Sequence, residues 1–249
     1  MDNLSIENSS PALPSISVII LALNEAGNIK KTIDTVTSLL AKQGFSDYEL
    51  LFLDGGSRDG TQQIVAQLAD SDSHLKVVPS PSNRGLGQGF RLGVEAASKE
   101  YVGWFPGDNE TLPETIQNIF EQIAKNKYDA ILPYTVNPWV RSVPRRILSV
   151  VYTSVFNILF GLNLKYFNGP CFFKRKILST IVMSADSPSY MAEILVQLIK
   201  KRKVSYVEVP MYIKIRDYGR TSVMQWKNVY LIGQTILGLI QKVYFSKRS

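Results

Sequence analysis

The chain has 249 residues and a net charge of +7, and it is long enough for one large domain or two small ones. Residues 1–125 hold 9 Lys and Arg against 16 Asp and Glu, whereas residues 126–249 hold 19 against 5, so the halves carry −7 and +14. A hydrophobic content of 45% excludes a disordered chain, and the single Cys171 excludes an intrachain disulfide framework. The basic half predicts an anionic partner such as phosphate, lipid headgroups or RNA.

The N-terminal half alternates strand and helix patterns. Residues 1–15 contain Ser, Asn and Pro without a basic segment followed by an apolar core, so they predict a flexible arm and not a secretory signal. Predicted strands cover 16–22, 48–54, 76–78 and 101–105, and helical patterns cover 29–40, 61–68 and a segment ending at Ala97. This alternation predicts an α/β fold with right-handed crossovers and a mainly parallel sheet flanked by helices.

Polar clusters follow three of these predicted strands. They are Asn24-Glu25, the run from Asp54 to Ser57, and the run from Gly107 to Glu110. Loops at the carboxyl ends of parallel strands converge on one edge of the sheet, where helix N-termini also point their N–H groups. Carboxylates at this edge predict a site for hydroxyl-rich groups and a divalent cation, because their oxygens suit both.

The second half loosens after a predicted strand over 128–134. A long helical stretch then opens at Ser142 and runs to Leu164, with a narrow polar stripe of Ser149, Thr153 and Asn157 on an otherwise apolar helix. Its uncharged part, residues 147–164, contains too many polar side chains for a predicted transmembrane span. Further predicted elements are a short one over 168–173, a helix near 190–200, a strand over 204–215 and a final helix over about 223–244.

Two arginines open the long helix. Arg145 and Arg146 lie where the helix dipole disfavours cations, which favours an anionic partner there. A solvated charged face is the alternative explanation of the same pair. RNA binding is the less favoured explanation of the basic half, because no motif of interleaved aromatic and basic residues is present.

Taken in order, these motifs resemble the family-2 glycosyltransferases of the GT-A fold, and most closely the polyprenol-phosphate (dolichol-phosphate type) sugar transferases. The resemblance spans roughly residues 16–222. It rests on Ile19 to Glu25, Asp54 to Thr61, Asn83 to Gly87, Asp108 with Pro113-Glu114, Glu208-Val209-Pro210, and Arg216 to Gly219. It implies inverting transfer of a sugar from a UDP- or GDP-sugar to a polyprenyl phosphate at the membrane surface.

The resemblance also implies a domain layout. The flexible arm over 1–15 precedes a GT-A domain over 16–222, with a donor half of about 16–125 and an acceptor half of about 126–222. A C-terminal amphipathic helix and basic tail follow over 223–249. The implied protein is cytoplasmic and peripherally associated with the membrane, has no nucleic-acid partner, and leaves homo-oligomerisation open.

Donor-site roles carry over by position. Donor binding falls to Asn24, Glu25, Asp54, Gly55 and Gly85, with Asp54 accepting hydrogen bonds from the base and Glu25 contacting the ribose. A plain turn explains Asp54, and a helix cap explains Asn24-Glu25, without any ligand.

The implied metal is Mg²⁺ or Mn²⁺ on the donor diphosphate. Asp108 matches the second acid of the family's D-x-D motif, and Glu110 is the other candidate ligand. Pro106 stands where the motif has its first acid, so metal dependence stays open.

Acceptor and leaving-group roles fall in the second half. Arg145 and Ser149 match positions that bind the acceptor phosphate, and Arg216 neutralises the departing diphosphate. Glu193 is the candidate general base, which an already ionised phosphate nucleophile does not require. Two alternatives remain: transfer to a hydroxyl of a saccharide or glycolipid, and a catalytically degenerate nucleotide-sugar-binding protein.

Overall fold

The computed structural model describes residues 12–80, 85–184, 189–215 and 226–245. The strands are β1 (Ile16–Ala22), β2 (Tyr48–Asp54), β3 (Leu75–Val77), β4 (Tyr101–Pro106), β5 (Ala130–Thr135), β6 (Phe172–Lys174) and β7 (Tyr206–Met211). The helices are α1 (Ile29–Lys42), α2 (Thr61–Ser71), α3 (Leu86–Ala96), α4 (Pro113–Ala124), α5 (Val143–Phe160), α6 (Arg175–Leu178), α7 (Tyr190–Leu195) and α8 (Trp226–Ile240). A short 3₁₀ turn, Pro138–Val140, precedes α5, and π-helical segments Val196–Lys201 and Gln241–Phe245 extend α7 and α8.

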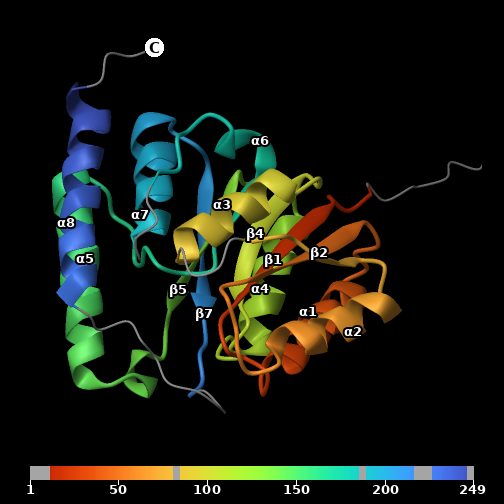
Figure 1. Ribbon diagram of the computed structural model, residues 1–249. Helices are drawn as coiled ribbons and strands as arrows, with labels where there is room; N and C mark the ends of the chain where they lie inside the picture. Colours follow the sequence, from red (N-terminus) through yellow and green to blue (C-terminus); the bar gives the residue numbers. More distant parts are fainter. Residues whose placement is uncertain (1–11, 81–84, 185–188, 216–225, 246–249) are drawn as a thin grey trace, which may run out of the picture.

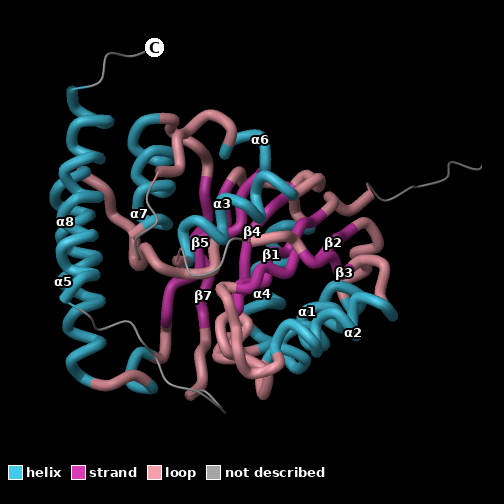
Figure 2. The backbone as a smooth tube through the Cα atoms, in the orientation of Figure 1, coloured by secondary structure: helices cyan, strands magenta, loops and turns pink. Residues whose placement is uncertain are grey.

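The described strands form one seven-stranded sheet in the order β3-β2-β1-β4-β6-β5-β7. Neighbouring strands are parallel except β6, which is antiparallel to both β4 and β5. Helices α1, α2 and α4 cover one face of the sheet, and α3 and α7 cover the other (Figures 1 and 2). The predicted α/β class with a mainly parallel, helix-flanked sheet is therefore confirmed, while the reversed β6 was not predicted.

The central strands are apolar along their whole length because both faces of the sheet are covered. Side chains alternate across β1, so Ile19 packs in the cluster that includes α3 and α7, whereas Ile20 packs in the cluster that includes α1 and α4. Gly93 lets α3 approach the sheet closely, since a Cβ there would lie 2.6 Å from the Cδ1 atom of Ile19. The spacing between helix and sheet is thus set at a single small residue.

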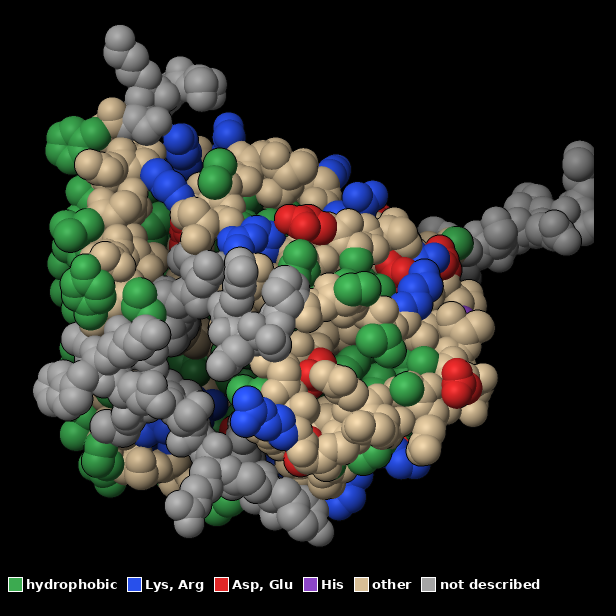
Figure 3. Space-filling view, in the orientation of Figure 1, with side chains coloured by type: hydrophobic (Ala, Val, Ile, Leu, Met, Phe, Trp, Pro, Cys, Tyr) green, Lys and Arg blue, Asp and Glu red, His purple; other side chains and the backbone are tan. Residues whose placement is uncertain are grey.

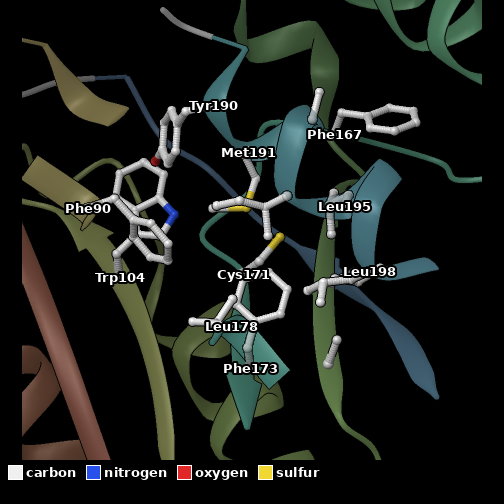
Figure 4. Packing of buried hydrophobic residues seen from close by; sticks show 14 of the residues in the cluster. Phe90, Trp104, Phe167, Cys171, Phe173, Leu178, Tyr190, Met191, Leu195 and Leu198 are labelled. Carbon is white, nitrogen blue, oxygen red and sulfur yellow. The ribbon is translucent and has the colours of Figure 1, made fainter. Parts of the chain in front are cut away.

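Cys171 belongs to the packed core. Figure 4 shows it among Met191, Phe173 and Leu195, which join it in one hydrophobic cluster. Burial raises the pKa of its thiol. The sequence interpretation of Cys171 as a small apolar filler agrees with this environment.

Helices α5 and α8 form an outer layer beside the sheet (Figure 1). The Tyr244 hydroxyl donates to the Leu159 carbonyl at 2.7 Å, and the Tyr244 ring stacks on Phe160. The predicted continuation of α5 to Leu164 is wrong. The helix ends at Gly161 with φ +58°, and the Asn157 side chain bonds both the N–H and the carbonyl of Leu164.

Glu49 is a buried carboxylate at the amino-terminal edge of the sheet. It accepts hydrogen bonds from Ser17 Oγ at 2.8 Å, from the Ser98 N–H at 2.7 Å and from Lys76 Nζ at 2.8 Å. Burial raises its pKa, but these hydrogen bonds outweigh burial and lower it from 4.5 to about 2. The carboxylate therefore joins β1, β2, β3 and the turn before β4 in its ionised form.

We expect Glu49→Gln to lower the free energy of unfolding by about 2 kcal/mol at neutral pH, because the amide loses charge-assisted hydrogen bonds at a buried site. The contribution is complete above the ordinary pKa of 4.5 and is lost as the pH falls toward 2. Urea unfolding between about pH 7 and pH 3 should show a shallower loss of stability in the variant than in the wild type. Parallel curves would contradict this role, and the exposed Asp47→Asn serves as control.

Candidate functional site

The three predicted polar clusters converge at the carboxyl edge of β2, β1 and β4. In the sheet register Ala22 lies opposite Asp54, and Leu21 lies opposite Pro106. The loops stay in contact beyond the strands, because Gly55 N–H donates to the Ala22 carbonyl and Gly107 N–H donates to the Leu21 carbonyl, both at 2.8 Å. The edge geometry predicted from the strand pattern is confirmed.

Asn24 and Glu25 join the loop after β1 to the loop after β2. Asn24 has φ +56°; its N–H donates to Ser57 Oγ at 2.8 Å, and its Oδ1 accepts from the Arg58 N–H at 2.9 Å. The Glu25 N–H donates to Thr61 Oγ1 at 2.9 Å. The Asn24 side chain thus bonds the neighbouring loop instead of capping α1.

The Glu25 carboxylate lies inside this junction. The residue is 5% exposed, and Oε2 accepts from Asn28 Nδ2 at 2.7 Å. Glu25 and Asp108 are the two buried carboxylates at this edge within the described residues. Together these two carboxylates place buried negative charge at this edge, which suits hydroxyl donors or a cation.

Asp54 organises the turn that follows β2. Its Oδ2 accepts from the N–H groups of Gly56 and Ser57, both at 2.8 Å, and from Gln62, while Oδ1 accepts from the Ser57 hydroxyl. Burial raises its pKa, but these hydrogen bonds outweigh burial and lower it. A carboxylate has about four acceptor sites, so a nucleotide base would reach Asp54 by replacing the exposed Gln62 amide.

Asp108 occupies a fixed turn after β4. Gly107 precedes it in close contact with Ala22, since a Cβ at Gly107 would lie 2.9 Å from the Ala22 Cβ. Asp108 is 6% exposed, and its Oδ1 accepts from the Glu110 N–H at 3.0 Å. The carboxylate is therefore held at the end of the central strand pair, next to the Glu25 loop.

The carboxylates present fit a cation only in part. Pro106 ends β4 at the position of the first D-x-D acid, and no group of three His, Cys, Asp or Glu within the described ranges could hold a metal ion. Mg²⁺ is commonly bound by one or two carboxylates together with substrate phosphates. Asp108 and Glu110 are the carboxylates at this edge that would fit that arrangement.

The first turn of α3 lies over the same edge. Gly85 precedes α3 with φ +85°, and Gly89 follows where a Cβ would lie 3.1 Å from the Leu21 Cδ2 atom. Gly85 is thus placed near the carboxyl end of β1, as its predicted donor role requires. The preceding Asn83 falls outside the described residues, and so does Arg216.

The segment leading to α5 is tied to the same end of the sheet. Asn137, after β5, bonds Ile213, after β7, through its Nδ2 at 2.8 Å and its Oδ1 at 3.1 Å. The next residue, Lys214, donates its N–H to the Glu110 carbonyl at 2.9 Å. Helix α5 therefore starts at the carboxyl end of the sheet, where Arg145 and Ser149 are half-buried and Arg146 is exposed (Figure 1).

Glu193 lies on α7, in contact with the extension of α8. Its carboxylate accepts from the Ser184 N–H at 2.9 Å, from Ser184 Oγ at 2.6 Å and from Lys242 Nζ at 2.7 Å. Glu193 is 3% exposed. Glu193 thus connects α7 to the extension of α8 through its ion pair with Lys242. Its role as a general base stays a prediction.

Sequence reasoning missed two groups near these loops. One is Asp59, which accepts from the Ala26 N–H at 3.0 Å and strengthens the junction of the first two loops. The other is Arg141 with Tyr166, joined at 3.1 Å beside the start of α5. A detectable signal existed for Arg141, because it precedes Arg145 and Ser149 at the same spacing of four residues.

The outward side of α5 and α8 is apolar. We call it the apolar helix face; its members are between 51% and 80% exposed and are Val143, Ile147, Val150, Val151, Ile158, Tyr230, Leu237, Tyr244 and Phe245. Figure 3 shows these helices lined with hydrophobic side chains along one side of the molecule. Neither α5 nor residues 226–245 contain Asp or Glu. Among the helices described, none is long and apolar enough to cross a membrane.

The strand order and the acidic loops at the carboxyl edge define the GT-A class of glycosyltransferase folds. The model of the glycosyl transferase family 2 matches residues 17–182, about two thirds of the chain, and the chain belongs to that family. A solved structure of glucosyl-3-phosphoglycerate synthase from Mycobacterium tuberculosis, with Mn²⁺, UDP-glucose and phosphoglyceric acid, is similar with a TM-score of 0.67. It is 17% identical, and the match covers 95% of this chain and 82% of that one, which confirms the fold.

Curated relatives match less than half of this chain. Glycosyltransferase AglE of Haloferax volcanii is 35% identical over 96 residues, covering 39% of this chain and 31% of the relative. Dolichol-phosphate mannosyltransferase of Saccharomyces cerevisiae is 28% identical over 107 residues, covering 43% of this chain and 40% of the relative. The chain thus matches only 31% to 40% of the length of these relatives.

Proposed function

We propose that this protein is an inverting glycosyltransferase that moves a sugar from a UDP- or GDP-sugar to a polyprenyl phosphate at a membrane surface. One observation carries the proposal. The acidic loops that hold Glu25, Asp54 and Asp108 and the cationic start of α5 lie at the same end of the sheet, beside the apolar helix face. A negatively lined donor site then adjoins a positively charged acceptor site next to an apolar surface.

On the donor side the chain binds and orients the nucleotide sugar. Asp54 would take the base, Glu25 the ribose hydroxyls, and Gly55 and Gly85 would let the backbone approach the nucleotide. Asp108 and Glu110 would hold a divalent cation, which when bound would neutralise charge on the donor diphosphate. That solved structures of glucosyl-3-phosphoglycerate synthase contain Mn²⁺ or Mg²⁺ with UDP supports this assignment.

On the acceptor side the chain positions an anion. Arg145 and Ser149 would hold the acceptor phosphate, one oxygen of which attacks the anomeric carbon from the face opposite the diphosphate. The new oxygen–carbon bond forms as the bond to the diphosphate breaks, and the nucleoside diphosphate leaves with the electron pair while Arg216 neutralises its charge. A phosphate is already ionised at neutral pH, so positioning and electrostatics dominate over general-base catalysis.

A donor and acceptor screen tests the proposal. The purified protein is incubated with UDP- and GDP-sugars and short-chain polyprenyl phosphates, with Mg²⁺, with Mn²⁺ and with chelator, and products are followed by mass spectrometry. A glycosylated prenyl phosphate with one donor is the expected result. Donor binding by calorimetry without transfer to any acceptor would instead support the catalytically degenerate alternative.

Transfer to a saccharide or glycolipid hydroxyl is the competing activity, and it needs a general base. Glu193 is the candidate, but its carboxylate is engaged with Lys242 and Ser184. Under that alternative Glu193→Gln abolishes turnover, whereas under our proposal a large residual rate remains.

The apolar helix face supports a peripheral location on the cytoplasmic side of a membrane. Its apolar residues suit the acyl boundary, and the basic half of the chain, at +14, suits anionic headgroups. A second copy of the chain covering the same face is the alternative occupant.

A further inference from the structure

The side of α5 that faces the domain changes character along its length. In the first three turns its partly buried residues are polar: Arg145, Ser149, Tyr152 and Thr153. One turn further the same side carries Phe156 and Phe160, both fully buried in the core. The polar part therefore faces the region at the carboxyl end of the sheet, while the apolar part fixes the helix to the domain.

Arg141 lies two residues before the first residue of α5, in an extended conformation just outside the N-cap Ser142. Its Nη1 donates to the Tyr166 hydroxyl at 3.1 Å, which fixes the plane of the guanidinium. Its Nε is buried and has no hydrogen-bond partner within the part of the chain that the structure describes. An unpaired buried N–H is energetically unfavourable, so this edge of the guanidinium favours an additional acceptor group.

Tyr166 accepts from Nη1 and not from the Nε edge, which is the edge that binds oxyanions best. Nε and Nη2 present two parallel N–H bonds, which match two oxygens of a phosphate. The Tyr152 hydroxyl on α5 is likewise buried and has no hydrogen-bond partner in the described part of the chain. Burial raises the pKa of Tyr152, so this hydroxyl stays neutral.

We propose that Arg141 is a further acceptor-binding residue, which takes a phosphate oxygen pair on its Nε edge while Tyr166 holds the guanidinium in place. The inference rests on the proposed function and deepens its acceptor site. A phosphomonoester carries a charge of about −1.5 to −2 at neutral pH, so two guanidinium groups, Arg141 and Arg145, balance it better than one. The site thus selects a monophosphate headgroup over a neutral alcohol.

The test separates acceptor from donor binding. In Arg141→Gln we expect the KM for a short-chain prenyl phosphate to rise at least about 10-fold, with donor KM and nucleoside-diphosphate affinity unchanged. Arg141→Lys keeps the charge but loses the two-pronged geometry, so it should recover only part of the loss. Tyr166→Phe should raise the acceptor KM about threefold, since the ring stays and the hydroxyl goes. The exposed Arg175→Gln, at the opposite edge of the sheet beside the start of β4, is the charge-matched control.

A binding arm keeps the inference separate from the proposed reaction. Calorimetry with the prenyl phosphate, the corresponding prenol and inorganic phosphate reports binding without turnover. Weakened prenyl phosphate binding in Arg141→Gln supports the inference even where the wild type transfers no sugar. Normal transfer with an acceptor KM that Arg141→Gln shifts no more than Arg175→Gln would overturn it and leave the proposed function standing.

Discussion

Asp108→Asn should lower turnover about 100- to 1,000-fold, the range seen when one preorganised charge-stabilising group is removed from an active site. Asp108 is the buried carboxylate at the end of β4, and Pro106 leaves it without the first acid of the D-x-D pair. The amide keeps the size and the hydrogen bond to the Glu110 N–H but loses the negative charge that would bind a cation under the proposed function. Initial rates under saturating donor and acceptor, with a titration of Mg²⁺ or Mn²⁺, measure the effect.

Glu114→Gln provides the matched control for this substitution. Glu114 is exposed in the first turn of α4, so its replacement removes the same charge from the same region without touching the buried edge. Its rate should stay within about twofold of the wild type, and thermal unfolding of both variants should be unchanged. A rate for Asp108→Asn close to that of Glu114→Gln would show that Asp108 takes no part in holding the donor.

The central strands were predictable because of where they lie. β1 and β2 are covered on both faces, and burial on both faces produces the continuous apolar runs that sequence reasoning detects. β6 was not predictable in direction, because three residues carry no periodicity and its antiparallel pairing is fixed by β4 and β5. The end of α5 was misplaced because the apolar pattern continues past Gly161, where the backbone adopts a left-handed conformation that ends the helix.

The candidate site also has features that the sequence predicts and features that it does not. The closeness of the three polar loops followed from the parallel topology, since loops after neighbouring parallel strands lie at the same edge of the sheet. The bonds that join Asn24 to Ser57 and Arg58 were not predictable, because these partners are 33 and 34 residues apart and carry no local signal. The bond between Glu193 and Lys242 was missed for the same reason, at a separation of 49 residues.

The orientation of α5 was the least predictable feature. Periodicity identified a wide apolar face and a narrow polar stripe, and an amphipathic helix ordinarily turns its apolar face to the core. Here Ser149, Thr153 and Asn157 face inward or are half-buried, while Val150 and Ile158 are exposed. Sequence pattern fixes the two faces of a helix but not which of them meets the domain.

The outward-facing apolar residues of α5 lead to the second large effect that we expect. A variant with Val151→Glu and Leu237→Glu, one change on each helix of the apolar helix face, should bind vesicles about 100-fold more weakly. Each buried Val or Leu contributes about 1.5 to 3 kcal/mol when fully removed from water, and a carboxylate adds repulsion from anionic headgroups. Co-sedimentation with vesicles of phosphatidylcholine and phosphatidylglycerol measures the loss, and pure phosphatidylcholine reports the electrostatic share.

The chain supplies a closely matched control for this pair. Val77 on the edge strand β3 and Val182 after α6 are 53% and 65% exposed, against 52% for Val151 and 68% for Leu237. Val77→Glu with Val182→Glu therefore adds the same charge at similar exposure away from the two helices, and it should leave vesicle binding unchanged. Equal loss in both variants would mean that charge alone governs binding. A different result would assign the apolar helix face to a second copy of the chain instead of a membrane. In that case the wild-type protein would not bind vesicles and would sediment as a dimer, and Val151→Glu with Leu237→Glu would convert it to a monomer.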